Sequence, residues 1–153
     1  HGGPDEAGPT PPPVPRAGPP AAATTWEGAV DDRRRRELLS QASMLAMCSD
    51  TESFGMTVLE AMADAVPVVV TKTCPWPDVE RHQTGFWVDQ NVEALAAAFD
   101  RMLANPSAAR AMGERGRALA ASTYGWSAVA SAFVDRYRAL RSHPVAAPLH
   151  VTT

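Results

Sequence analysis

The sequence has few of the residues on which disulfide scaffolds and metal sites depend. Cys48 and Cys74 are its only cysteines, and each lies beside an apolar or turn segment, so we interpret them as free thiols in a reducing compartment. The four histidines show no metal-ligand spacing with these cysteines. We therefore expect no disulfide framework and no metal site.

Missing motifs exclude several other classes of function. No apolar run approaches the roughly 18 residues of a membrane-spanning helix, and the longest, residues 66–70, suits a buried strand. Glycine-rich phosphate and dinucleotide motifs are absent, and so is the strand–nucleophile–helix elbow of serine hydrolases. The formal net charge of −3 rules out a broadly basic surface, so nucleic acid is not an expected partner.

The composition is that of an ordinary globular domain. The chain has 153 residues, of which 45% are hydrophobic and 20% charged, enough for one domain with a real core. It begins at His1 without a visible signal peptide, and we interpret it as a piece of a longer protein.

The N-terminal part of the chain is rich in proline. Eight of the 14 prolines lie in the first 23 residues. Because proline fixes φ and removes a backbone donor, residues 9–20 can form neither a helix nor a central strand. We predict a polyproline-like or disordered segment. It is either a linker without a binding role or, through residues 11–15, a ligand for a proline-reading module.

From residue 31 onward, helical and strand patterns alternate. Residues 31–32 offer N-cap oxygens to a first helix, around which the arginines at 33–36 would fan as a solvated face. In the second helix we expect Leu59, Met62 and Ala63 to face inward. The predicted helices cover residues 33–43, 56–65, 92–103, 107–122 and 127–141, and the predicted strands cover 44–48, 66–70 and 86–88. This alternation predicts an α/β fold with a parallel sheet covered on both faces.

Residues 49–60, between a predicted strand and a predicted amphipathic helix, are the most informative about chemistry. Ligands of open parallel sheets bind outside the carboxyl ends of the strands, where such loops lie. Gly55 would let the backbone approach a ligand closely. The amides that follow, from Met56 to Val58, are unpaired donors of a helix N-terminus and would suit a pyrophosphate.

Two glutamates flank this turn. Glu60 lies about four residues inside the helix, roughly 6 Å along its axis, where a carboxylate would repel phosphate but accept hydrogen bonds from the vicinal hydroxyls of a ribose. Glu52 precedes the helix and can reach toward the hydroxyls of a sugar. Together they predict a nucleotide-sugar site. The alternative is that Glu52 is an ordinary loop residue and Glu60 a solvated helix residue.

The residues around these glutamates resemble a known family. ESFGMTVLEAMA at 52–63, followed by PVVV at 67–70, closely resembles the signature of the family 4 glycosyltransferases, which are retaining enzymes of the GT-B type. The resemblance covers about residues 26–140. Stretches similar to the loop and strand of bacterial polysaccharide-type members, and to the family's C-terminal helices, are found at 74–80, 85–88, 104–106, 113–117 and 124–126.

The resemblance implies an incomplete Rossmann-like three-layer domain, the C-terminal half of a GT-B enzyme, with a UDP- or GDP-linked sugar as donor substrate. Glu60 would bind the donor ribose, and Glu52, the carboxylate assigned to the catalytic site, would contact a hydroxyl of the transferred sugar. No metal or other cofactor is implied. Backbone amides facing the sugar and diphosphate would come from Phe54, Gly55, Met56 and Thr57. Pro75 and Trp76 would border the pocket, unless Trp76 instead fills a gap between loop and sheet.

The chain also departs from the family pattern. Asp64-Ala65-Val66 stands where members usually have a small pair such as Cys-Gly, and alanine tolerates most helix-end conformations except φ > 0. Residues 10–23 replace a charged amphipathic helix, which indicates a reading-frame slip or a degraded copy. The N-terminal acceptor domain and the family's phosphate-binding Arg and Lys are missing, and Lys72 does not match that motif.

We therefore divide the chain into a remnant loop with the proline-rich segment (1–31), a donor-binding domain (32–141) and a flexible tail (142–153). The expected function is that of a hexosyltransferase domain acting on a glycan, lipid or small acceptor, inactive as an isolated fragment. Its expected location is the cytoplasm, free or peripheral at the inner face of the membrane. Three alternatives remain open: a non-catalytic remnant, an interaction protein using its proline-rich arm, or a nucleotide-sugar epimerase of the same architecture.

Overall fold

The computed structural model describes residues 24–142. The chain divides into two units, residues 1–30 and residues 31–153. Within the first unit, the described residues 24–30 form neither helix nor strand. The predicted remnant loop, the proline-rich segment and the tail beyond residue 142 lie outside the described residues. No helix within residues 24–142 is long and apolar enough to cross a membrane.

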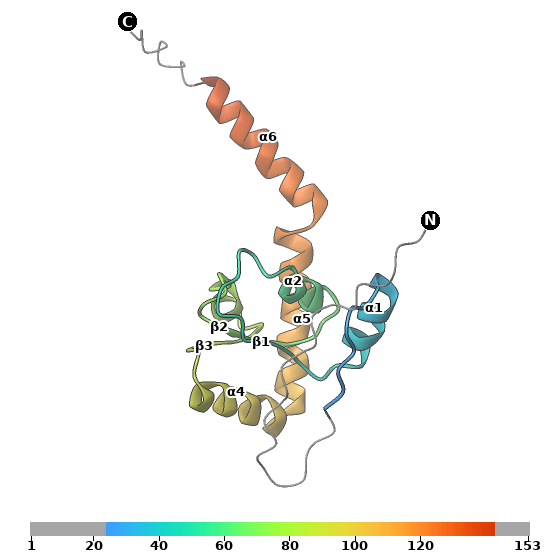
Figure 1. Ribbon diagram of the computed structural model, residues 1–153. Coiled ribbons are helices and arrows are strands. Elements are labelled where there is room, and N and C mark those ends of the chain that lie inside the picture. The colour runs from blue at the N-terminus through green and yellow to red at the C-terminus, as the bar shows by residue number, and fades with distance from the viewer. Residues whose placement is uncertain (1–23, 143–153) are drawn as a thin grey trace, which may run out of the picture. The chain divides into compact units, whose positions relative to one another are not determined.

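A three-stranded parallel sheet lies at the centre of the second unit (Figure 1). Its strands are β1 (Leu45–Met47), β2 (Val68–Thr71) and β3 (Gly85–Val88), in the spatial order β1-β2-β3. Leu45 pairs with Val68, and Val68 pairs with Gly85. Because all three strands are parallel, their carboxyl ends meet at one edge of the sheet. The predicted α/β fold with a parallel sheet is confirmed.

Six helices accompany the sheet in the described residues. Asp31 caps the first, accepting a hydrogen bond of 2.7 Å from the Arg34 amide, as the sequence predicts. Asn91 and Asn105 cap the starts of two later helices in the same way. The helices are α1 (Asp32–Gln41), α2 (Met56–Ala63), α3 (Asp78–Arg81), α4 (Val92–Ala104), α5 (Pro106–Thr123) and α6 (Trp126–Ser142).

Side chains of β2 alternate between two cores, one on each face of the sheet. Val68 and Val70 pack with α2 and the C-terminal half of α5. Val69 points to the other face, where it packs with α4 and the N-terminal half of α5. Figure 1 shows the strands between α2 and α4. The predicted three-layer arrangement is confirmed, and every residue of β2 is buried.

The buried face of α2 differs in part from the prediction. Met62 is buried as expected, but Ala63 is exposed and Leu59 is only half-buried. The buried residues Val58, Ala61 and Met62 are three and four positions apart, which is the spacing of one helix face. Ala63 lies outside that face, so its assignment as an inward residue is wrong.

The turn from α2 to β2 contains a strained residue. Ala65 has a φ of 60°, a left-handed conformation that costs an L-residue about 1–2 kcal/mol and glycine almost nothing. The strain lies at the position where the sequence departs from a family pattern that ends in a small residue such as glycine. Glycine removes this strain but also gives the unfolded chain more conformational entropy, which offsets part of the gain. We therefore expect Ala65→Gly to raise the free energy of unfolding by about 0.5–1 kcal/mol, as measured by urea denaturation.

The matched control is Ala97→Gly, because Ala97 is exposed in the interior of α4, where alanine suits the helix. That change should lower the free energy of unfolding by about 1 kcal/mol. Equal losses of stability in the two variants would show that the conformation of Ala65 carries no strain.

Candidate functional site

The loop between β1 and α2 turns sharply at a glycine. Gly55 is buried, has φ 80° and ψ 60°, and directly precedes the first residue of α2. Its carbonyl accepts a hydrogen bond of 2.9 Å from the Val58 amide. The amides of Met56 and Thr57 donate to no other residue that the structure describes. The predicted turn is confirmed, but the prediction of an unpaired amide at Val58 is wrong, because the turn itself takes up that donor. The amides of Met56 and Thr57 remain as donors at a helix N-terminus, where anions bind favourably.

Glu52 lies against this turn. Its Oε1 accepts hydrogen bonds from the amides of Ser53, at 2.9 Å, and Phe54, at 3.3 Å. A Cβ added to Gly55 would stand 3.4 Å from Glu52 Cγ. The structure therefore brings Glu52 and Gly55 together. The predicted contact of Glu52 with a sugar hydroxyl stays a prediction.

Glu60 has a partner that the sequence did not indicate. Its Oε2 lies 3.2 Å from Nε of Arg35 on α1, and its side chain is 27% exposed. The prediction that the arginine run is simply a solvated face is wrong in part for Arg35, because its buried Nε lies against Glu60 of α2 while the side chain stays 38% exposed. Glu60 lies one turn inside α2, as expected from the sequence.

The turn after β2 packs against the loop between β1 and α2. Trp76 is only 1% exposed, and its indole N–H donates to the carbonyl of Phe54. Its ring lies 5.2 Å from that of Phe54 and 5.4 Å from that of Tyr124, centroid to centroid. Trp76 therefore fills the gap between loop and sheet, the second of the two interpretations above. Pro75 is exposed, and its place at a pocket rim stays a prediction.

Tyr124 and Asp78 complete this support and were missed by the sequence reasoning. The Tyr124 hydroxyl donates to Asp78 Oδ2 at 3.2 Å. Burial, together with the charge of Asp78, raises the pKa of Tyr124 above its usual value. The family-like stretches at 74–80 and 124–126 contain these two residues, but they carried no information about the contact between them.

The loops after the three strands are tied to one another at the carboxyl edge of the sheet. Thr73 Oγ1 donates to the carbonyl of Ser49 at 2.5 Å, which joins the turn after β2 to the loop after β1. Lys72 Nζ lies 2.8 Å from Asp89 Oδ1, which joins β2 to the loop after β3. Hydrogen bonding and the charge of Asp89 raise the pKa of Lys72. Lys72 is thus an exposed cation at this edge that is paired with a neighbouring acid.

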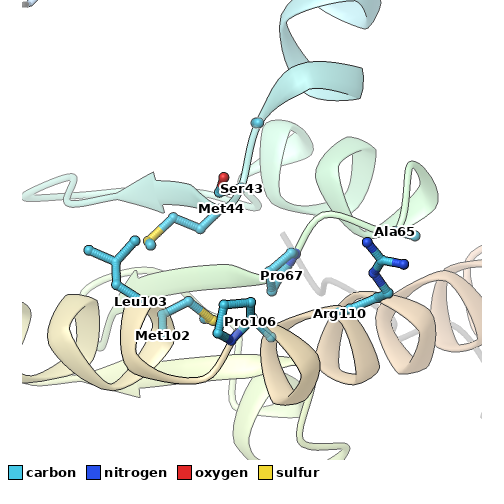
Figure 2. A pocket seen from close by; sticks show the side chains of 10 residues that line it. Ser43, Met44, Ala65, Pro67, Met102, Leu103, Pro106 and Arg110 are labelled. Carbon is cyan, nitrogen blue, oxygen red and sulfur yellow. The ribbon is translucent and has the colours of Figure 1, made fainter.

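A hollow of about 330 Å³ lies elsewhere (Figure 2). Met44 and Pro67, which line it, directly precede β1 and β2, so the hollow is at the amino edge of the sheet. None of the predicted site residues lines it. The carboxyl edge is the better candidate, because the free amides and both glutamates of residues 49–60 lie on the loop and helix that follow β1 there. Among residues 24–142, no group of three potential metal ligands is present.

Comparisons with known proteins bear on the family of the chain. Residues 20–119 match the family described as glycosyl transferases group 1. The chain is 38% identical over 103 residues to a D-inositol 3-phosphate glycosyltransferase of Streptomyces griseus, covering 66% of this chain and 22% of that protein. It is 29% identical to an MMP α-(1→4)-mannosyltransferase of Mycolicibacterium hassiacum, covering 65% and 25%. The chain thus spans about a quarter of the length of these relatives.

A solved structure gives the same result for the fold. The sucrose-phosphate synthase of Thermosynechococcus elongatus superposes with a TM-score of 0.67 at 33% sequence identity, over 76% of this chain and 30% of that one. Residues 20–119, which match the family, contain the turn at Gly55 and both glutamates. The chain therefore belongs to the glycosyl transferases group 1 family.

Proposed function

We propose that this chain is the donor-binding part of a retaining glycosyltransferase and that it binds the nucleoside diphosphate portion of a nucleotide sugar. The observation that carries the proposal is the turn at Gly55, after which the amides of Met56 and Thr57, at the start of α2, have no hydrogen-bond acceptor among the described residues. Family membership supports it, because the relatives named above are glycosyltransferases.

Each part of the site has a distinct task in this proposal. The diphosphate lies on the N-terminal amides of α2, where the helix dipole favours negative charge and stabilises the leaving group. Glu60, one turn further along, accepts hydrogen bonds from the ribose hydroxyls. Glu52, on the loop side of Gly55, contacts a hydroxyl of the transferred sugar. Experiment will decide whether the donor nucleotide is UDP or GDP, and which acceptor receives the sugar.

Isothermal titration of the chain with UDP and with GDP tests the proposal. We expect saturable heat with one of them, and we expect Glu60→Ala to weaken that binding by about 1–3 kcal/mol, the scale of lost charge-assisted hydrogen bonds. The control is Glu93→Ala, because Glu93 is an exposed glutamate in the first turn of another helix, α4.

The outcomes separate the proposal from its alternatives. Unchanged affinity in Glu60→Ala would remove Glu60 from the site. The absence of heat with either nucleotide, from a chain that circular dichroism shows to be folded, would instead favour a remnant that keeps the fold without the donor site.

A further inference from the structure

Arg35, in the run of four arginines on α1, contacts a residue of another helix. Arg33 lies 3.4 Å from Glu37, and Arg36 donates to the carbonyl of Asp32, so both make contacts within α1. Arg35 instead reaches α2, where its Nε is 3.2 Å from Glu60 Oε2. Its Nη2 also lies 3.3 Å from Asp32 Oδ1. The guanidinium of Arg35 is thus held between an acid of its own helix and the glutamate of the candidate site.

The contact between Arg35 and Glu60 is close but not aligned. Arg35 Nε is buried and forms no hydrogen bond with a described residue, although Glu60 Oε2 is within ion-pair distance. The N–H therefore does not point along the line to the oxygen. The terminal torsion of a glutamate side chain is soft, so a small rotation of the Glu60 carboxylate satisfies this buried donor. Arg35 favours one orientation of the carboxylate over the others.

That orientation leaves acceptor capacity for a ligand. A carboxylate has two oxygens with about four lone-pair directions, and after that rotation Nε–H of Arg35 would occupy one of them on Oε2, whereas at present the two atoms are only within ion-pair distance. Oε1 has no partner among the described residues. A planar guanidinium holds a carboxylate at a defined angle, which an ammonium cannot do. A carboxylate held in this way loses less side-chain conformational entropy on binding the two hydroxyls of a diol than an unrestrained one does.

We propose that Arg35 is a positioning residue for the donor site: it orients the Glu60 carboxylate so that this acid reads the 2′,3′-diol of the donor ribose. The proposal rests on the proposed function above. It assigns Arg35 no contact with the ligand, so its effect passes through Glu60 alone.

Titration calorimetry with UDP, GDP and their 2′-deoxy analogues tests this assignment. We expect the wild-type chain to bind the ribonucleotide about tenfold more tightly than its 2′-deoxy analogue, the size of about one charge-assisted hydrogen bond. Arg35→Gln should weaken ribonucleotide binding about five- to tenfold and weaken 2′-deoxy binding much less, so that the preference falls to about twofold. A merely structural defect would weaken both nucleotides alike.

The chain supplies the controls. Arg33→Gln removes an arginine of the same run whose ion pair, within residues 24–142, is with Glu37 of its own helix, and it should change neither affinity. In the Glu60→Gln background, Arg35→Gln should have no further effect, because the two residues act as one unit. Arg35→Lys keeps the charge without the planar fork and should restore less than half of the lost preference.

Several results would overturn the assignment. These are equal effects of Arg33→Gln and Arg35→Gln, additive losses in the double variant, or tighter binding by Arg35→Gln, which would make Arg35 a competitor for Glu60. If Glu60→Gln weakens binding while Arg35→Gln does not, only the assignment of Arg35 fails. If the folded wild-type chain binds none of the four nucleotides, the proposed function fails with it.

Discussion

Replacing Gly113 by alanine is expected to lower the free energy of unfolding by about 3–4 kcal/mol, the scale of severe overpacking in a core. Gly113 is buried in α5 where this helix passes the turn between α2 and β2. A Cβ there would lie 1.9 Å from the carbonyl oxygen of Ala65 and 2.7 Å from its carbon. These are backbone atoms, which cannot rotate away as a side chain can. The helix itself must move outward and open its contacts with α2, and the better helix propensity of alanine returns only about 1 kcal/mol.

Gly116→Ala is the matched control for this expectation. Gly116 is a second buried glycine of α5, but the nearest atoms to its added Cβ belong to the Met62 side chain, with Cγ at 3.1 Å. These contacts are too close by only a few tenths of an ångström, so a small shift of Met62 relieves them at much lower cost than the backbone clash at Gly113. Urea unfolding followed by circular dichroism should therefore place Gly116→Ala within about 1 kcal/mol of wild type. Similar urea midpoints for Gly113→Ala and Gly116→Ala would show that α5 can move away from Ala65 at little cost, and would contradict the expectation.

The sequence predicts the fold well where one local signal decides the structure. The β-branched run at 66–70 predicts β2 because it is apolar on both faces, and such a strand must lie inside a covered parallel sheet. Asp31 and Asn91 predict helix starts because their side chains cap the backbone directly. The short helix α3 was not predicted, since its four residues offer no periodicity to detect.

The candidate site was predictable only in the part that is contiguous in the sequence. Gly55, with the two glutamates that flank it, lies within nine residues of chain, so spacing and family resemblance both apply. The residues that hold this segment are distant in sequence: Arg35 contacts Glu60 from another helix, and Trp76 and Tyr124 pack on Phe54 from two later segments. Contacts of this kind depend on tertiary packing. No pattern in a single sequence encodes them.

That packing makes the turn at Gly55 the most sensitive point of the site. We expect Gly55→Ala to lower the free energy of unfolding by about 2–4 kcal/mol and to weaken nucleotide binding by more than tenfold. A left-handed conformation costs alanine about 1–2 kcal/mol, since Gly55 has a φ of 80°. The added Cβ also lies 2.9 Å from Trp76 Nε1 and 3.3 Å from Met47 Sδ, and such crowding costs about 1–3 kcal/mol.

Two further variants, one at Gly28 and one at Gly55, separate the backbone strain of a left-handed residue from the crowding caused by an added Cβ. Gly28 has a φ of 67° and nothing within 4 Å of an added Cβ, so Gly28→Ala should change stability by less than about 1 kcal/mol. Gly55→Asn keeps a residue that tolerates the left-handed conformation but still crowds the indole, so it should remain strongly destabilised. Trp76 must then retreat and give up its hydrogen bond to the Phe54 carbonyl, which moves the amides that would face the diphosphate in the proposed site. Wild-type nucleotide affinity in a folded Gly55→Asn variant would show that those amides do not hold the donor.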